Sequence, residues 1–225
     1  MRQYLVRHGE SVSNREGRVQ GQSDVELSAA GRAQAAAVGG WSRGLAASAP
    51  VGEIWSSPLK RALETAEAIA AAVGLPVRID ERLSELHAGI FQGHLWADLE
   101  LRFPEEVSRW RGGDPHYAIP GGESRAALAA RGQEAIRSLA SRDTASMIVV
   151  AHGGLLTAAL GGLVGRDHPL LAAAAERPFT RLPALDNCSL TILDWPGPRL
   201  VTFNETSHLP PVTADPSPRP PPDGR

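Results

Sequence analysis

Two short apolar stretches of this 225-residue sequence each end in a histidine followed by a glycine. "YLVRHG" delivers Arg7 and His8, and "VVAHGG" delivers His152. Both stretches are typical of buried strands, and in an open parallel sheet ligands bind where the strands end. A third stretch, "EIWSS", leads into a helix predicted to begin at Pro58 and to carry Arg61 in its first turn. We therefore expect two imidazoles and two guanidinium groups at one rim of a sheet.

This combination of side chains is suited to phosphoryl transfer. Arginine forks match the oxygens of a phosphoryl group and neutralise its charge. A neutral imidazole held in one tautomer can attack phosphorus and carry the group as phosphohistidine. A carboxylic acid can protonate the leaving oxygen, and Glu85 in "ERLSELHAGIFQG" is a candidate beside the neighbouring acids Asp80 and Glu81. Glycines after both histidines, Gly153 among them, let backbone N–H groups approach a ligand.

The elements that must position these residues alternate in the manner of an α/β protein. Extended segments are predicted at 3–7, 52–57, 77–83, 147–154, 188–195 and 199–205. Helices are predicted at 28–47, 58–74, 96–103, 123–141 and 155–165. Ser28 suits the N-cap of the first of these helices, and Gly74 suits the stop of the second.

The amino-acid composition of the chain limits which binding partners and which cellular compartment we expect. The formal net charge of -2 favours neither nucleic acid nor an anionic membrane as the main partner. The single cysteine, Cys188, excludes an internal disulfide and fits a reducing compartment. Without a signal peptide pattern or an apolar run long enough to span a bilayer, we expect a cytoplasmic protein. Residues 1–209 are predicted to form one domain, and the proline-rich residues 210–225 a disordered tail.

Six sequence blocks, in order along the chain, resemble the histidine phosphatase superfamily in its phosphoglycerate mutase-like branch. The blocks are "LVRHGES", "GRVQGQSDVELSAAGRAQA", "SSPLKRALETA", "ERLSELHAGIFQG", "GGES" and "VVAHGG". The match runs from Tyr4 to about His208 and is nearest to bacterial cofactor-independent phosphatases. The resemblance implies a three-layer α/β sandwich, with a mostly parallel central sheet flanked by helices and a small helical lid at about 82–122.

The same resemblance implies a role for each candidate residue. It makes His8 the phosphorylated nucleophile and Glu85 the proton donor. It assigns the phosphoryl oxygens to basic residues and two amides, namely Arg7, Arg61, His152, Asn14 and Gln20. "FNETSHL" is similar to the C-terminal segment that reaches the pocket in phosphoserine phosphatases of this family. We therefore expect His208 to contact a substrate carboxylate, with a merely strand-ending role as the alternative.

A phosphatase passes its phosphohistidine to water, whereas a mutase returns the group to its substrate. The stretch "LHAGIFQGHLW" after Glu85 resembles the phosphatase pattern. We predict a metal-independent phosphoric monoester hydrolase acting on a small phosphorylated metabolite: phosphoserine, a phosphoglycerate derivative or a sugar phosphate. A cofactor-dependent phosphoglycerate mutase and a non-catalytic phosphate-binding member of the fold remain the alternatives. We expect no cofactor and no metal, because His87, His94 and His116 lack the spacing of zinc ligands. A homodimer is left open.

Overall fold

The computed structural model describes residues 1–173 and 184–210, so the predicted tail lies outside the described residues except for Pro210. Within those ranges the centre is a six-stranded sheet in the order β3-β2-β4-β1-β5-β6. The strands are β1 (Arg2–Arg7), β2 (Glu53–Ser56), β3 (Val77–Ile79), β4 (Ser146–Ala151), β5 (Leu190–Asp194) and β6 (Arg199–Glu205). The first four strands run parallel, and β5 and β6 add two antiparallel pairs at one edge. The predicted mostly parallel sheet is confirmed.

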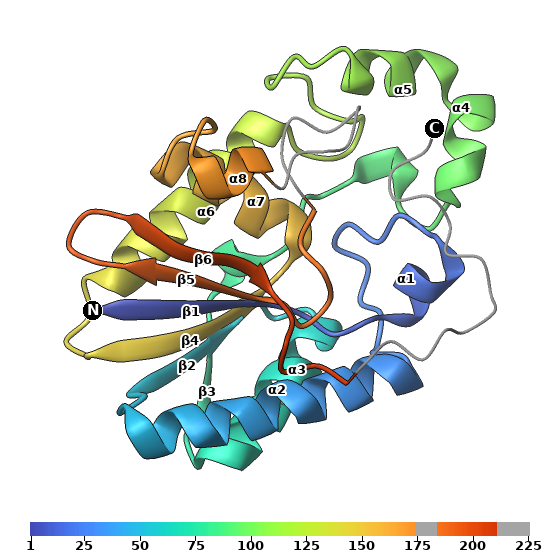
Figure 1. The fold of residues 1–225 in the computed structure, drawn as a ribbon. Helices are drawn as coiled ribbons and strands as arrows, with labels where there is room; N and C mark the ends of the chain where they lie inside the picture. The colour runs from blue at the N-terminus through green and yellow to red at the C-terminus, as the bar shows by residue number, and fades with distance from the viewer. Residues whose placement is uncertain (174–183, 211–225) are drawn as a thin grey trace.

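Helices cover both faces of this sheet (Figure 1). One layer holds α2 (Ala29–Ser48) and α3 (Lys60–Val73), and the other holds α6 (Arg125–Ala140), α7 (Gly153–Leu163) and α8 (Pro169–Ala173). Successive residues of β1 alternate between the two cores: Leu5 packs toward α6 and α7, whereas Tyr4 and Val6 pack toward α2 and α3. The result is the predicted three-layer sandwich. None of the helices in the described ranges is long and apolar enough to cross a membrane.

Local chemistry sets the start of α2 and the end of α3 as predicted, whereas α7, predicted at 155–165, begins two residues earlier, at Gly153. The Ser28 hydroxyl accepts the Gly31 N–H at 3.0 Å at the start of α2. Gly74 ends α3 in the left-handed region, with φ of +81°. The prediction that α3 begins at Pro58 is wrong, because the chain bends at Pro58 and Leu59 and the helix starts at Lys60, with Leu59 as its N-cap residue. The Leu59 N–H donates instead to the Ser57 hydroxyl, which faces the rim.

A set of short elements between β3 and α6 forms a cap over one end of the sheet (Figure 1). They are the 3₁₀ turns Glu81–Leu83, Gly89–Phe91 and Trp96–Asp98, and the helices α4 (Leu99–Arg102) and α5 (Pro104–Arg111). Their buried side chains make a separate cluster that includes Phe91, Leu99 and Val107, together with Val19 from the loop after α1 (Val12–Glu16). Apart from Val19, the buried residues of this cluster fall inside the range predicted for the lid. The boundaries of the lid, at about residues 82 and 122, stay a prediction.

The extended segment predicted at 77–83 is wrong over its second half. Strand β3 ends at Ile79, and the Asp80 carboxylate accepts the Arg82 N–H, which turns the chain. Helix α5 was not predicted, although Pro104 at its first turn and the acidic Glu105 beside it are ordinary start signals.

Candidate active site

Adjacent strands bring the two predicted histidines together. In the parallel register of β1 and β4, Arg7 lies opposite Ala151, so His8 and His152 follow at the same edge. The His8 N–H donates to the Ala151 carbonyl at 3.0 Å. The imidazole ring centroids lie 5.1 Å apart, and both rings are buried, with 2% and 0% of the residue exposed. The sheet therefore sets the spacing of the two imidazoles.

The environment of His8 holds its ring neutral and in one tautomer. Nδ1 lies 2.7 Å from the Gly9 carbonyl oxygen, which can only accept, so Nδ1 carries the proton. The lone pair is then on Nε2. Burial, followed by the nearby charges of Arg61 and Arg7, lowers the pKa of His8 well below its usual value. A neutral imidazole with an available Nε2 lone pair is the form that attacks phosphorus.

His152 is oriented by a hydroxyl group at the end of β2. Its Nε2 lies 2.8 Å from Ser57 Oγ. The same oxygen accepts the Leu59 N–H at 3.3 Å, and because a hydroxyl group can donate one hydrogen bond and accept two, its contact with Nε2 fits either neutral tautomer of His152. Among the described residues, Nδ1 is a buried atom without a hydrogen-bond partner. Burial first, and then the charge of Arg61, lowers the pKa of His152. His152 thus keeps one ring nitrogen, Nδ1, for a hydrogen bond with a bound ligand.

Arg61 is a buried cation. It is 1% exposed, and its guanidinium group donates to the carbonyl oxygens of Gly21 at 2.8 Å and Ser23 at 2.9 Å. Burial lowers its pKa to about 10, which leaves it charged at neutral pH. Within the described residues it forms no salt bridge of its own, and its Nε is buried without a partner. A charge placed so is expected to be balanced by a bound anion.

Arg7 lies beside the first residue of α7. Its guanidinium group donates to the Leu185 carbonyl. A Cβ at Gly153 would come within 3.3 Å of Arg7 Nε, so the glycine lets the arginine lie against the start of the helix. The predicted substrate-binding residue Gly153 is therefore placed next to a predicted phosphate ligand. Arg7 and Arg61 are also close enough for the charge of each guanidinium group to act on His8.

Glu85 reaches the same rim from the lid segment. Its Oε2 accepts the Gly154 N–H, and its Oε1 accepts the N–H groups of Leu155 and Leu86, each at 2.9 Å. The first two donors belong to the first turn of α7, which follows directly after His152. The carboxyl group is thus fixed beside the buried imidazoles. Neither Asp80 nor Glu81 takes this place: Asp80 pairs with Arg82 on the turn before it.

The two predicted amides lie around one hydroxyl group. Ser11 Oγ accepts the Asn14 N–H at 3.1 Å and lies 2.6 Å from Gln20 Oε1. Sequence reasoning missed Asn187, whose Nδ2 donates to the His8 carbonyl at 3.0 Å and lies 3.4 Å from Asn14 Oδ1. The available signal was its position just before a buried strand, at the edge where the parallel strands end.

His208 lies apart from this cluster. Its Nε2 is 3.0 Å from the Cys188 carbonyl, and its ring centroid is 6.0 Å from that of Trp41 on α2. These contacts belong to the layer of α2 and α3. The predicted contact of His208 with a substrate carboxylate stays a prediction that these interactions do not support.

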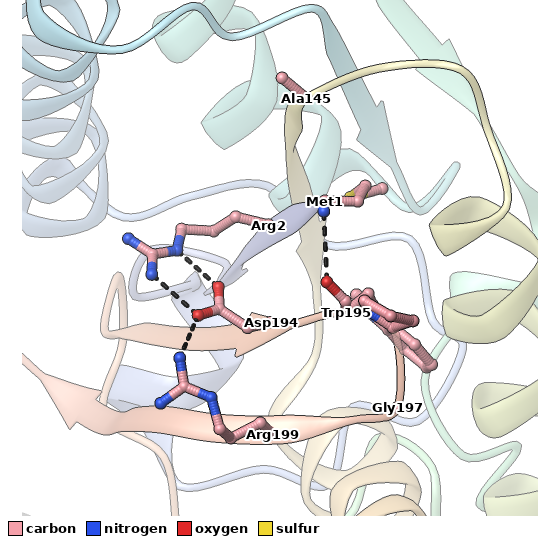
Figure 2. Close-up of a pocket in the computed structure, with 8 residues that line it drawn as sticks. Met1, Arg2, Ala145, Asp194, Trp195, Gly197 and Arg199 are labelled. Carbon is pink, nitrogen blue, oxygen red and sulfur yellow. Dashed lines mark hydrogen bonds and ion pairs between the residues drawn. The ribbon is translucent and has the colours of Figure 1, made fainter.

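A pocket of about 440 Å³ lies at the opposite end of the sheet (Figure 2). Arg2, at the first position of β1, forms an ion pair with Asp194 at 2.6 Å, and Arg199 pairs with the same carboxylate at 2.6 Å. Strand β1 separates this pocket from His8. The charged groups of this pocket, Asp194 and the two arginines, pair with one another. The pocket is therefore distinct from the candidate site.

Acid is expected to destabilise the protein through its two buried histidines. The folded-state pKa of each lies below the unfolded value near 6.5, so below that pH the unfolded chain takes up protons that the folded one does not. Between about pH 7 and pH 5, each histidine should lower the unfolding free energy, by about 2 kcal/mol at most. Urea unfolding of wild type and His8→Ala at both pH values measures this. The variant should lose less unfolding free energy than wild type on acidification, and an equal loss would contradict the assignment.

Comparisons with known proteins agree with this geometry. The sequence pattern of the histidine phosphatase superfamily (branch 1) matches residues 3–206. Glucosyl-3-phosphoglycerate phosphatase of Mycolicibacterium vanbaalenii is 38% identical over 189 residues, covering 79% of this chain and 82% of that protein. A probable phosphoglycerate mutase, GpmB of Salmonella choleraesuis, is 36% identical over 218 residues, or 92% and 94% of the two chains. A solved mycobacterial glucosyl-3-phosphoglycerate phosphatase in complex with VO3 is 32% identical, with a TM-score of 0.73 over 91% of this chain and 99% of that one.

Proposed function

We propose that this chain, which belongs to the histidine phosphatase superfamily and is a phosphoric monoester hydrolase, dephosphorylates a glycosylated phosphoglycerate. The enzyme class predicted from the sequence is confirmed. The observation that carries the proposal is the buried group of His8, Arg61 and His152, with Glu85 beside it, at one end of the sheet. The relatives named for glucosyl-3-phosphoglycerate support the choice of substrate class.

In the first half-reaction, Nε2 of His8 attacks phosphorus in line with the ester oxygen. The Nε2–P bond forms as the P–O bond breaks, and the departing oxygen takes a proton from Glu85. Arg7, Arg61 and His152 hold the phosphoryl oxygens, whose charge they stabilise throughout the transfer. The proton of His8 stays on Nδ1, which donates it as a hydrogen bond to the Gly9 carbonyl oxygen and so steadies the phosphorylated ring. Asn14 and Gln20 complete the phosphate pocket.

In the second half-reaction, water takes the place of the departed alcohol. Glu85 accepts a proton from this water, whose oxygen attacks phosphorus as the Nε2–P bond breaks. Inorganic phosphate leaves, and the imidazole is neutral again. The group that protonates the alcohol therefore deprotonates the water, so both steps need the carboxyl group at one position.

A phosphoglycerate mutase is the second candidate, because the similarity to the probable mutase of Salmonella choleraesuis covers more of this chain than the similarity to the phosphatase does. The two candidates differ in where the phosphoryl group of His8 goes. A mutase would transfer it to the free hydroxyl of a phosphoglycerate, and would need a bisphosphorylated primer to load the histidine.

Turnover of a small panel of phosphomonoesters in EDTA tests the proposal. We expect kcat/KM on glucosyl-3-phosphoglycerate to exceed that on 3-phosphoglycerate, phosphoserine and glucose 6-phosphate by at least about tenfold. Isomerisation of 3-phosphoglycerate that depends on 2,3-bisphosphoglycerate would establish the mutase instead. Binding of these compounds without any turnover would mean a non-catalytic member of the fold. The cytoplasmic location and the homodimer stay predictions.

A further inference from the structure

An arginine on α6 holds the backbone of the segment that carries Glu85. Arg131 Nη1 donates to the carbonyl oxygens of Arg82 at 2.8 Å and Ser84 at 2.7 Å, and its Nη2 lies 3.3 Å from the Glu85 carbonyl. Strand β3 has ended at Ile79, so these carbonyl groups have no strand neighbour. One guanidinium group thus takes the place of a strand partner over this turn.

A carboxylate, that of Glu123, binds the same segment on the C-terminal side of Glu85. Glu123, just before α6, accepts from Arg131 Nη2 at 2.6 Å, and the same Oε1 accepts the His87 N–H at 2.9 Å. The Glu123 N–H donates in turn to the His87 carbonyl at 2.9 Å. The Arg131–Glu123 pair therefore forms hydrogen bonds with the backbone both before and after Glu85. Both side chains are mostly buried, with 23% and 20% exposed.

Helix α6, which carries Arg131, packs closely on α7, which binds the Glu85 carboxyl group at the rim. A Cβ on Gly132, the residue after Arg131, would lie 3.0 Å from side-chain atoms of Leu155. Leu155 also donates its N–H to the Glu85 carboxyl group. On the same helix, a Cβ on Gly154 would lie 2.7 Å from Glu85 Oε1. The backbone of Glu85 is thus fixed from α6, and its carboxyl group from α7, by two helices in direct contact.

We infer that Arg131, backed by Glu123, is a positioning residue that keeps Glu85 at the oxygen of the leaving alcohol. The inference rests on the proposed function, in which Glu85 is the proton donor. Proton transfer to the leaving group matters for an alkyl phosphate, because an alkoxide is a poor leaving group, and little for p-nitrophenyl phosphate, whose phenolate leaves unaided. Loss of Arg131 should therefore change the ratio of the two rates. A merely structural role would change both rates alike.

The test compares kcat on 3-phosphoglycerate and on p-nitrophenyl phosphate in Arg131→Met, Arg131→Lys and wild type. A shift of the carboxyl group by about 1 Å should lower the alkyl-to-aryl ratio of kcat about 10–100-fold in Arg131→Met. Arg131→Lys should restore part of the ratio, since an ammonium group reaches fewer carbonyls. Arg137→Met, an exposed change on the same helix, should leave the ratio as it is. The ratio does not depend on the fraction of folded enzyme.

Glu85→Gln is the reference variant. It should lower the ratio at least as much as Arg131→Met, and the double variant should show no further fall, because both changes remove one function. A normal ratio in Arg131→Met beside a lowered one in Glu85→Gln would overturn the inference alone. A normal ratio in Glu85→Gln would overturn the proposed proton donor, and the inference with it. If Arg131→Met does not fold, Glu123→Gln weakens the ion pair with Arg131 and should lower the ratio about threefold or more.

Discussion

Replacement of His8 by alanine is expected to lower kcat on every phosphomonoester by at least about 10⁴-fold. The reason is that no other described nucleophile has the same placement: Nε2 of His8 carries a lone pair, its ring is neutral, and Arg7 and Arg61 are near enough to attract the phosphoryl group to it. The neighbouring His152 differs from His8 because its own Nε2 is held by the Ser57 hydroxyl group. His8→Ala should still bind inorganic phosphate, because the guanidinium groups remain.

The measurement pairs steady-state rates with chemical trapping. Wild type quenched during turnover of a ³²P-labelled substrate should carry acid-labile, base-stable label on the peptide that contains His8, and His8→Ala should carry none. His116→Ala, which changes an exposed histidine in the lid loop, is the matched control and should keep full activity and full labelling. Substantial turnover by His8→Ala, or label on another residue, would show that the phosphoryl group takes a different route.

Much of this arrangement could be predicted because local residues encode it. An apolar run that ends in His-Gly indicates a buried strand that releases its polar residue at the sheet edge, and it does so at both His8 and His152. Ser28 and Gly74 set their helix ends through their own hydrogen bond and backbone freedom. The chemistry of the rim followed from residue types alone, whereas the choice of Glu85 over its acidic neighbours needed the family resemblance.

The residues that sequence reasoning missed act through backbone groups far along the chain. Arg131 lies 46 positions from the carbonyl of Glu85, and Asn187 lies 179 positions from that of His8. A backbone carbonyl has no sequence signature, so neither partner can be recognised before the fold is known. The predicted start of α3 was wrong at a place where the chain makes contacts of the same kind: the Ser57 hydroxyl contacts His152, 95 positions away, and accepts the Leu59 N–H before the helix starts at Lys60.

Arg61→Met is expected to lower kcat/KM by about 10³-fold on alkyl and aryl phosphates alike, since it removes transition-state charge stabilisation rather than proton transfer. The variant leaves the carbonyls of Gly21 and Ser23 without their donor, but it also removes a buried cation, so these two effects on stability oppose each other. The cleaner readout is therefore stabilisation by ligand. Inorganic phosphate at about 100 times its Kd should raise the unfolding free energy of wild type by about 2.7 kcal/mol, and that of Arg61→Met far less.

The adjacent cation supplies the control for this variant. Lys60 is the residue before Arg61, is largely exposed, and pairs with Asp24 at 3.7 Å, so Lys60→Met should change both readouts little. Arg61→Lys keeps the charge but cannot reach two carbonyls and a phosphoryl oxygen together, and should recover only part of the lost rate. If phosphate stabilises Arg61→Met as much as wild type, the buried guanidinium is a structural cation, and the anion site must be built from the other residues of the rim.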